Sequence, residues 1–288
     1  MTDRRRSRRF TRRRFLRLLG GTVAGGVAAS VIDAFAVEPR WINVTCPTLV
    51  VEHLGAGWDG VRIAHLTDLH VGRLISLDHV RKAVDLANAA GPDLVVLTGD
   101  FVSRRRAIND ALTDALKALR APLGAFAVLG NHDHWTDAAA VVKSITAAGV
   151  RMLDNGRTVL TRGGDPLVLA GVGDLWEGAP DLGAALAGAP AEAPRVLLCH
   201  NPDYADRMPA DPRVDLMLCG HTHGGQVKVP FGGRPQLPIR NLKYAAGFVP
   251  GPHCPMYVSV GLGMVGIPVR FNCRPELPVI TLRRSTPA

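Results

Sequence analysis

Five short groups of acidic, amide and imidazole side chains follow apolar runs in the middle of the chain. Carboxylates, amide oxygens and imidazoles are the ligand types that hold divalent metal ions such as Zn, Mn or Fe. The groups are Asp68 with His70, Asp100, Asn131 with His132, His200, and His221 with His223. A lone histidine or Asp-x-His pair arises often by chance, whereas five such groups in one chain predict a site for two metal ions.

The spacing inside two of the groups suggests how their side chains converge. Alternate residues of an extended segment share a face. We therefore expect Asp68 and His70 to point toward one place, and His221 and His223 to do the same. Neighbouring glycines such as Gly220 permit the backbone turns that aim such ligands.

The elements that must position these groups alternate between strand and helix patterns. Apolar runs lead into the ligand groups and predict buried strands that end in functional loops. These runs are residues 61–66, 93–97, 124–129, 167–172, 195–199, 214–219 and 256–260. Helical periodicity is found at 77–90 and 108–119. Asp68 to Asp100 spans 32 residues and Asp100 to Asn131 spans 31, each the size of a strand, a crossover helix and a strand.

This alternation predicts an α/β fold. Two α/β halves packed together form a four-layer α-β-β-α sandwich, with the metal site at the carboxyl ends of the strands. Residues 178–194, rich in Ala, Gly and Pro, are expected to be a connecting loop. We expect one domain over residues 37–288, and 47% hydrophobic and 20% charged residues are typical of such a globular unit.

The net charge of +9 is concentrated at the amino terminus. Residues 1–17 hold nine arginines and one acid, which leaves 25 basic and 24 acidic residues for the remainder. The basic residues of the first segment are Arg4, Arg5, Arg6, Arg8, Arg9, Arg12, Arg13, Arg14 and Arg17. Because the body has no comparable basic surplus, we expect no nucleic-acid partner.

The amino-terminal segment has the three parts of an export signal. A basic stretch is followed by apolar residues 18–36, which end in the small-x-small sequence Ala34-Phe35-Ala36. The arrangement Thr-Arg-Arg-x-Phe-Leu-Arg at 11–17 resembles the twin-arginine signal of bacteria, which implies the twin-arginine translocation machinery as a partner. We expect residues 1–36 to be this signal, cleaved after Ala36. The alternatives are an uncleaved membrane anchor, an amphipathic or core helix behind a basic tail, or a nucleic-acid arm.

The ligand groups together resemble the complete motif set of the calcineurin-like metallophosphoesterases. The match covers Asp68-x-His70, Gly99-Asp100, Gly130-Asn131-His132-Asp133, His200 and Gly220-His221-x-His223, in that order over about 160 residues. Gly224-Gly225-Gln226 and residues 270–276 further resemble an exported or membrane-associated bacterial phosphodiesterase branch of that family.

The resemblance implies a role for each residue of the motif set. One metal ion would be held by Asp68, His70 and His223, the other by Asn131, His200 and His221, with Asp100 bridging the two. His132 would stay off the metals as the catalytic group that stabilises the transition state or protonates the leaving oxygen, and Asp133 would orient it. The donor set suits two divalent ions, with Mn, Zn, Fe and Co all acceptable.

These assignments predict a metal-dependent phosphodiesterase in which a metal-bridging hydroxide attacks phosphorus. Arg73 and Arg270 are the candidate substrate-binding residues. We expect a monomer that acts in the periplasm or cell envelope and is associated with the membrane if the signal is retained. The alternatives are a lipid-linked nucleotide-sugar pyrophosphatase of the UDP-2,3-diacylglucosamine type, a phosphomonoesterase, and a non-catalytic metal-dependent binding protein of the envelope.

Overall fold

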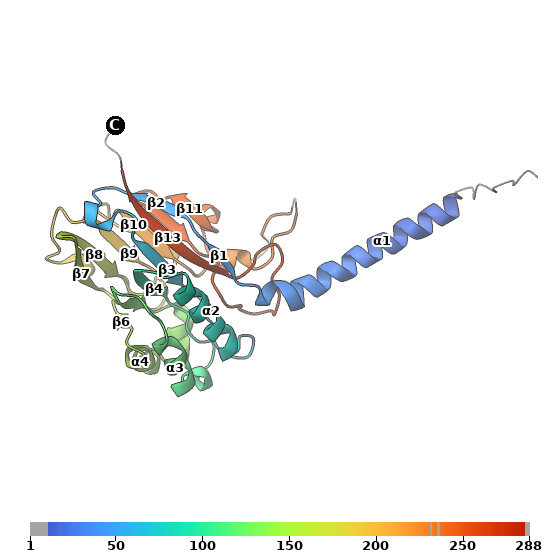
Figure 1. Ribbon diagram of the computed structural model, residues 1–288, viewed down its shortest axis with the longest axis horizontal. Coiled ribbons are helices and arrows are strands. Elements are labelled where there is room, and N and C mark those ends of the chain that lie inside the picture. Colours follow the sequence, from blue (N-terminus) through green and yellow to red (C-terminus); the bar gives the residue numbers. More distant parts are fainter. Residues whose placement is uncertain (1–10, 231, 235–236, 286–288) are drawn as a thin grey trace, which may run out of the picture.

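Two β-sheets lie face to face, with the three longer helices of the body on the outer side of one sheet (Figure 1). The computed structural model describes residues 11–230, 232–234 and 237–285. The first sheet has the order β1 (Asn43–Thr45), β13 (Glu276–Arg284), β3 (Arg62–Leu66), β4 (Leu94–Thr98), β5 (Ala125–Val128) and β6 (Arg151–Met152), with β2 (Thr48–Val51) also paired to β13. The strands β3 to β6 are parallel, and β13 is antiparallel to β3.

The second sheet repeats this plan. Its order is β11 (Gly247–Pro250), β12 (Pro255–Val258), β10 (Leu216–Cys219), β9 (Arg195–Leu198), β8 (Asp165–Gly171) and β7 (Gly156–Arg162). The four central strands are parallel and the two edge strands are antiparallel. The expected α/β class and the strands predicted from apolar runs are therefore confirmed.

Helices complete the outer layers. The outer face of the first sheet is covered by α2 (Leu77–Ala89), α3 (Asp110–Lys117) and α4 (Asn131–Ala147). Ser76 caps α2 by accepting from the backbone N–H of His79, and Val80, Ala83 and Val84 face the core at helical spacing. The second sheet carries only the short α5 (Leu182–Leu186) and 3-10 turns such as η5 (Pro202–Asp206). The fourth layer is thus present but thin.

The apolar core explains why the strands read as continuous hydrophobic runs. Strands β4, β9 and β10 are buried along their whole length because both faces are covered. Between the sheets, Leu94 and Val96 of the first pack in one cluster with Leu169, Val196 and Leu218 of the second. This shared core fixes the two sheets against each other, and with them the loops at the strand ends.

Two expectations about local structure need correction. The segment 178–194 is not only a loop, because α5 lies within it and buries Leu182 and Leu186 against the second sheet. The helix α4 begins at Asn131 itself, directly after Gly130, so that one ligand group lies in the first turn of a helix.

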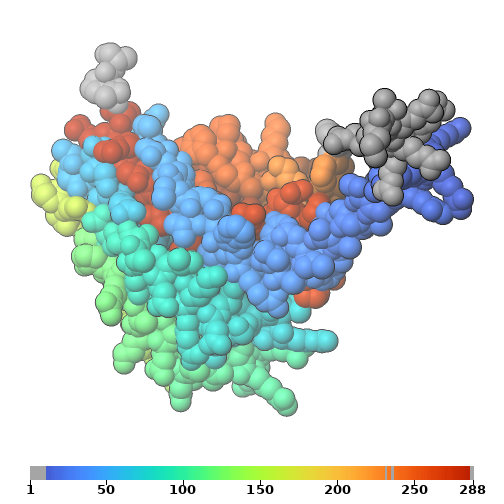
Figure 2. Space-filling view, turned by 45° about the vertical axis from the view of Figure 1, so that its right-hand side comes forward, coloured from blue at the N-terminus to red at the C-terminus, as the bar shows by residue number. Residues whose placement is uncertain are grey.

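The amino-terminal helix α1 (Arg12–Ile32) extends away from the body (Figures 1 and 2). None of its residues is buried, so the core-helix alternative is wrong. Within the described residues, the stretch Arg12–Arg40 is long and apolar enough to cross a membrane, a property that signal sequences share. The arginines before residue 11 lie outside the described residues.

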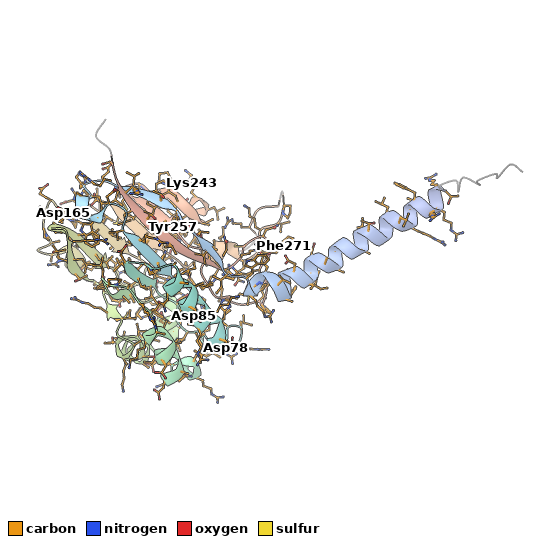
Figure 3. The ribbon with its side chains drawn as sticks, viewed as in Figure 1. Asp78, Asp85, Asp165, Lys243, Tyr257 and Phe271 are labelled. Carbon is orange, nitrogen blue, oxygen red and sulfur yellow. The ribbon has the colours of Figure 1, made fainter. Side chains whose placement is uncertain are left out.

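The chain joins the body just beyond α1. The π-helix η1 (Asp33–Val37) and the 3-10 turn η2 (Glu38–Arg40) follow the helix. The carbonyl of Ala34 accepts a hydrogen bond from the backbone N–H of Arg270 at 3.0 Å, and the buried Glu38 carboxylate accepts from the N–H groups of Asn272 and Cys273. Phe271 accordingly lies at the base of α1 (Figure 3).

Candidate metal centre

The predicted ligand groups all follow the carboxyl ends of parallel strands. Asp68 and His70 follow β3, Asp100 follows β4, Asn131 follows β5, His200 follows β9, and His221 and His223 follow β10. Because the two sheets face each other, these ends meet at one edge of the sandwich. The six proposed histidine and aspartate ligands and His132 fall into three groups, and the ligand atoms of each group lie within 4.8 Å of one another. Asn131 directly follows Gly130, which lies against Asp100 and His200.

The backbone conformation that brings these ligands together differs from the expected one. Asp68, His70, His221 and His223 have φ values of 53°, 48°, 70° and 49°, which place them in the left-handed region rather than in an extended segment. Asp100 has a φ of 55°. The explanation by alternation along a strand is therefore wrong: each pair turns inward through left-handed residues. Such conformations cost about 1–3 kcal/mol each and concentrate at functional sites.

One half of the centre is formed by Asp68, His70 and His223. The Nε2 atoms of His70 and His223 are 3.0 Å apart, and His223 Nε2 lies 3.3 Å from Asp68 Oδ1. All three side chains are buried. Ring nitrogens and a carboxylate oxygen thus point at a common position from two different sheets.

Asp100 joins this half to the other one. Its Oδ2 atom lies 3.3 Å from His70 Nε2 and also 3.3 Å from His200 Nε2. His200 Nε2 is in turn 3.1 Å from His221 Nδ1. A single carboxylate between two sets of imidazoles is the arrangement required of a ligand shared by two cations.

The donor atoms of the centre are suited to metal ions. Asn131 is almost fully buried, and its Oδ1 atom has no hydrogen-bond partner among the described residues. A buried carbonyl oxygen without a donor costs free energy, and a metal ion can satisfy it. Together with the imidazoles and carboxylates, it forms a set of N and O donors that fits Mn, Fe, Zn or Co.

Hydrogen bonds behind the imidazoles indicate which nitrogens face the metals. His200 donates from Nδ1 to the carbonyl of Thr98 at 2.7 Å, and His221 donates from Nε2 to the carbonyl of Pro238 at 3.0 Å. In the neutral form of each ring, this donation leaves the other nitrogen free to bind a metal, namely Nε2 of His200 and Nδ1 of His221. His70 Nδ1 is fixed by Ser103 Oγ at 2.9 Å. Such partners hold metal-binding histidines in one orientation and tautomer.

The electrostatics of the centre favour a cation beside Asp100. Burial alone raises the pKa of the Asp100 carboxyl, but His200 and His70 outweigh it and hold that pKa well below its usual range. Burial opposes a charged His200, yet Asp100 raises the pKa of His200 well above its ordinary value. Burial, reinforced by His200, lowers the pKa of His221 to about 3. Metal binding at this carboxylate therefore competes with a proton on His200.

Asp133 occupies a different position from the expected one. Its carboxylate accepts from the backbone N–H groups of Asp100, Phe101, Val102 and Gly130 at 2.8, 2.8, 3.3 and 3.0 Å. Among the described contacts none joins Asp133 to the His132 ring, so the expected orientation of His132 is not seen. The side chain instead ties the loop that follows β4 to the start of α4.

His132 lies at the open side of the centre. Its ring contacts His70 edge-on with centroids 4.7 Å apart, and its backbone N–H donates to Asp100 Oδ1 at 2.8 Å. Burial lowers the pKa of His132 to about 4, although Asp100 works in the opposite direction. The ring is only partly buried, which leaves it accessible to a substrate. Its position is also within reach of a metal ion held by His70 and Asp100.

The two arginines proposed to bind substrate are placed very differently. Arg73 is exposed and lines a pocket of about 410 Å³ together with Arg104 and His132, which we call the Arg73 pocket. Arg270 is completely buried, and its guanidinium donates to the carbonyls of Val260, Gly261, Gly263 and Cys273. The structure does not support a substrate contact for Arg270, because its donors are used inside the protein.

Two tryptophans beside the centre were not anticipated. Trp135 in α4 contacts the His132 ring with centroids 4.8 Å apart, and Trp176 contacts the His221 ring at 4.6 Å. The two indoles lie 6.2 Å apart and nearly parallel. Trp135 stands one helical turn after Asn131, which could have indicated its position, whereas the sequence around Trp176 carries no such pattern.

Comparisons with known proteins agree with this geometry. The model of the family described as calcineurin-like phosphoesterase matches residues 61–225. The uncharacterized metallophosphoesterase YkuE of Bacillus subtilis is 34% identical over 96% of this chain and 99% of its own length. Phosphodiesterase YaeI of Escherichia coli is 34% identical over 94% and 99%. A transmembrane protein with a metallophosphoesterase domain from Danio rerio is 29% identical over 87% of this chain and 59% of its own length.

Proposed function

Because the chain belongs to the calcineurin-like phosphoesterase family, we propose that this metal-dependent phosphoric ester hydrolase cleaves phosphodiesters outside the cytoplasmic membrane. The observation that carries the proposal is the position of Asp100 Oδ2, 3.3 Å from ring nitrogens of two histidines that belong to different sheets. We assign one ion to Asp68, His70 and His223, the second to Asn131, His200 and His221, and the bridge to Asp100.

Two divalent ions held at these residues would supply a nucleophile from water at neutral pH and would neutralise charge on phosphoryl oxygens. The chain's own residues orient the substrate and handle the leaving group. His132 presents an accessible ring beside Asp100, and burial lowers its pKa to about 4. We assign it to stabilising the transition state or protonating the leaving oxygen.

The surroundings of the centre have room for a diester. A second pocket of about 390 Å³ is lined by His223, Thr222, Leu237 and Val265, and it shares Val265 and Gly266 with the Arg73 pocket. The two pockets therefore adjoin each other beside the ligands, which leaves room for the two organic groups of a diester. The relative named phosphodiesterase supports the same assignment.

Hydrolysis of bis-p-nitrophenyl phosphate tests the enzymatic proposal. The chain loaded with Mn, Zn, Fe or Co should release p-nitrophenolate, and Asp100→Asn should lower the rate by roughly 10²- to 10³-fold, because the shared carboxylate no longer carries charge. Metal analysis should show fewer than two ions bound to that variant. Inactivity of the wild-type chain with all four metals would rule out the proposed phosphodiesterase activity.

The location outside the cytoplasmic membrane, in the periplasm or cell envelope, is proposed from the amino-terminal segment. The helix α1 is unburied, begins within the twin-arginine-like sequence at 11–17, and could serve as a signal or a membrane anchor. At the bond proposed for cleavage, after Ala36, the side chains of Phe35, Ala36 and Val37 are exposed, whereas Ala34 is buried. The Glu38 contacts lie beyond that bond and would survive cleavage.

An export experiment separates these possibilities. Replacing Arg12 and Arg13 by Lys should leave the protein in the cytoplasm if the twin-arginine machinery is its carrier. Mass spectrometry of the protein from the envelope fraction should then show an amino terminus at Val37 for a cleaved signal. An intact amino terminus in the membrane fraction would instead identify α1 as an anchor.

A further inference from the structure

The exposed tryptophans next to the metal centre form a surface whose role the hydrolytic centre does not explain. Trp135 is 55% exposed and Trp176 is 48% exposed. Large aromatic side chains stabilise a fold mainly by burying their area. These two tryptophans remain about half exposed, and each contacts one histidine ring, His132 or His221. Such a pair contributes little to the core and is well placed to contact a ligand.

The two indoles come from separate halves of the molecule. Trp135 belongs to α4 of the first sheet, whereas Trp176 lies in the loop after β8 of the second. The rings of His132, Trp135, Trp176 and His221 form one continuous row, with centroids 4.8, 6.2 and 4.6 Å apart. A group bound on this row would be directly adjacent to a phosphoryl group held at the metal centre.

A carboxylate accompanies the indoles. The exposed Glu177 accepts a hydrogen bond from Trp135 Nε1 at 2.7 Å, which places its negative charge at the edge of the aromatic pair. One of its carboxylate oxygens remains for another partner. An anionic leaving group would be repelled here, whereas a positive group would be attracted.

The loop that carries these groups is held in place before any ligand binds. The buried Asp174 accepts at Oδ1 from the backbone N–H groups of Trp176 and Glu177, at 2.8 and 3.1 Å. Asn155 accepts from the N–H of Gly173 at 2.9 Å and donates to the carbonyl of Ala179 at 3.0 Å. A preorganised surface loses less entropy when a ligand binds.

We propose that Trp135, Trp176 and Glu177 form a subsite for an organic ammonium group, so that the preferred substrates are zwitterionic phosphodiesters. Exposed aromatic rings with a carboxylate at their edge supply the π electrons and the negative charge that attract quaternary ammonium ions. The same physics is already seen at Trp41, where the Arg274 guanidinium lies 4.0 Å above the ring. Among the described residues, Arg274 over Trp41 shows that a tryptophan of this chain can hold a cation on its ring. This inference rests on the proposed phosphodiesterase activity and names its substrate class.

Two esters that differ by one charge provide the test. The first is p-nitrophenyl phosphocholine, and the second is p-nitrophenyl 3,3-dimethylbutyl phosphate, in which carbon replaces the ammonium nitrogen. In both reactions water adds to phosphorus, the bond to the aryl oxygen breaks, and p-nitrophenolate leaves with the electron pair. The wild-type kcat/KM should favour the choline ester by about tenfold, within the range of about twofold to thirtyfold expected for cation–π recognition.

Three variants assign the preference to the subsite. Glu177→Gln and Trp176→Leu should each bring the ratio of the two kcat/KM values toward one. Trp41→Leu is the matched control, because that tryptophan is similarly exposed but packs on Arg274, and it should keep the wild-type ratio. Equal kcat/KM values for the two esters in the wild-type chain, or an unchanged ratio in both subsite variants, would overturn the proposal.

Binding without turnover separates this inference from the proposed function. Choline chloride should quench the tryptophan fluorescence of the metal-loaded Trp41→Leu chain saturably, 3,3-dimethylbutanol should not, and the effect should disappear when Trp176→Leu is added. If no diester is hydrolysed, the phosphodiesterase assignment fails while the choline titration still decides the subsite. Turnover of glycerophosphocholine as against phosphatidylcholine vesicles then distinguishes a soluble source of the headgroup from a lipid one.

Discussion

The Asp133 carboxylate accepts a hydrogen bond of 2.8 Å from the backbone N–H of Asp100, a residue 33 positions earlier in the chain. Since Asp100 has a left-handed φ of 55°, the contact holds the proposed bridging ligand in a conformation that it would not adopt unaided. The chemistry of Asp100 thus depends on a neighbour that touches only its backbone.

Asp133→Asn should weaken metal binding and lower stability. An amide offers one accepting oxygen where the carboxylate offers two, and its NH2 group would face N–H donors of the loop. We expect metal affinity to fall about 10- to 100-fold and the free energy of unfolding to fall by about 3 kcal/mol. Isothermal titration with Mn and urea unfolding measure the two effects. Asp114→Asn, at an exposed position of α3, is the control, and a variant that behaves like this control would contradict the assignment.

His132→Ala should separate catalysis from metal binding. If His132 acts on the leaving oxygen or the transition state, both ions remain bound and kcat falls by about 10²- to 10⁴-fold. Metal analysis and steady-state kinetics with bis-p-nitrophenyl phosphate give the two readouts, with the exposed His253→Ala as the control. Loss of an ion, with activity restored by excess Mn, would instead make His132 a metal ligand.

Arg270→Lys should loosen the loop behind Asp68. A lysine cannot reproduce the hydrogen bonds that the buried guanidinium gives to Gly261 and Gly263. The N–H of Gly263 donates to the carbonyl of Asp68, so the effect should reach that ligand. We expect a loss of about 3–5 kcal/mol in unfolding free energy, because a buried charge loses its partners, together with weaker binding of one ion. Arg274→Lys at an exposed site is the control, and unchanged metal stoichiometry at limiting Mn would exclude a positioning role.

We expect His65 to lower the free energy of unfolding when the pH falls. Burial lowers the pKa of His65 to about 3, from an ordinary value of 6.5. Because the folded pKa is depressed, the unfolded chain binds the proton first, so stability is complete above pH 6.5 and is lost as the pH falls toward 3. Between pH 8 and pH 5 the loss from this group is about 2 kcal/mol.

His65→Gln tests this pH dependence. Glutamine keeps a hydrogen-bonding group near Thr98 Oγ1, which lies 2.8 Å from His65 Nε2, but it does not titrate. The difference in unfolding free energy between the two chains should therefore shrink on acidification, measured in urea at equal metal saturation. Parallel stability curves from pH 8 to pH 5 would show that His65 does not carry the effect.

The sequence alone determined which residues could form the centre and on which kind of element each would lie. Apolar runs before Asp68, Asp100 and His200 predicted strands, and the structure has β3, β4 and β9 there. These features follow from local patterns, because a strand that is buried on both faces has apolar residues at consecutive positions. The long-range pairing of β13 beside β3 was beyond such reasoning, because no local pattern specifies a partner more than 200 residues away.

Only the tertiary structure decided how the ligands meet and what surrounds them. It placed Asp68 and His223 at 3.3 Å through left-handed turns on opposing sheets, and it turned Arg270 from a presumed substrate contact into a buried support. It also set Trp135 beside Trp176. The physical reason is common to all three: the position of a side chain at a sheet edge depends on the packing of the two sheets, which residue types and spacing within one segment do not encode.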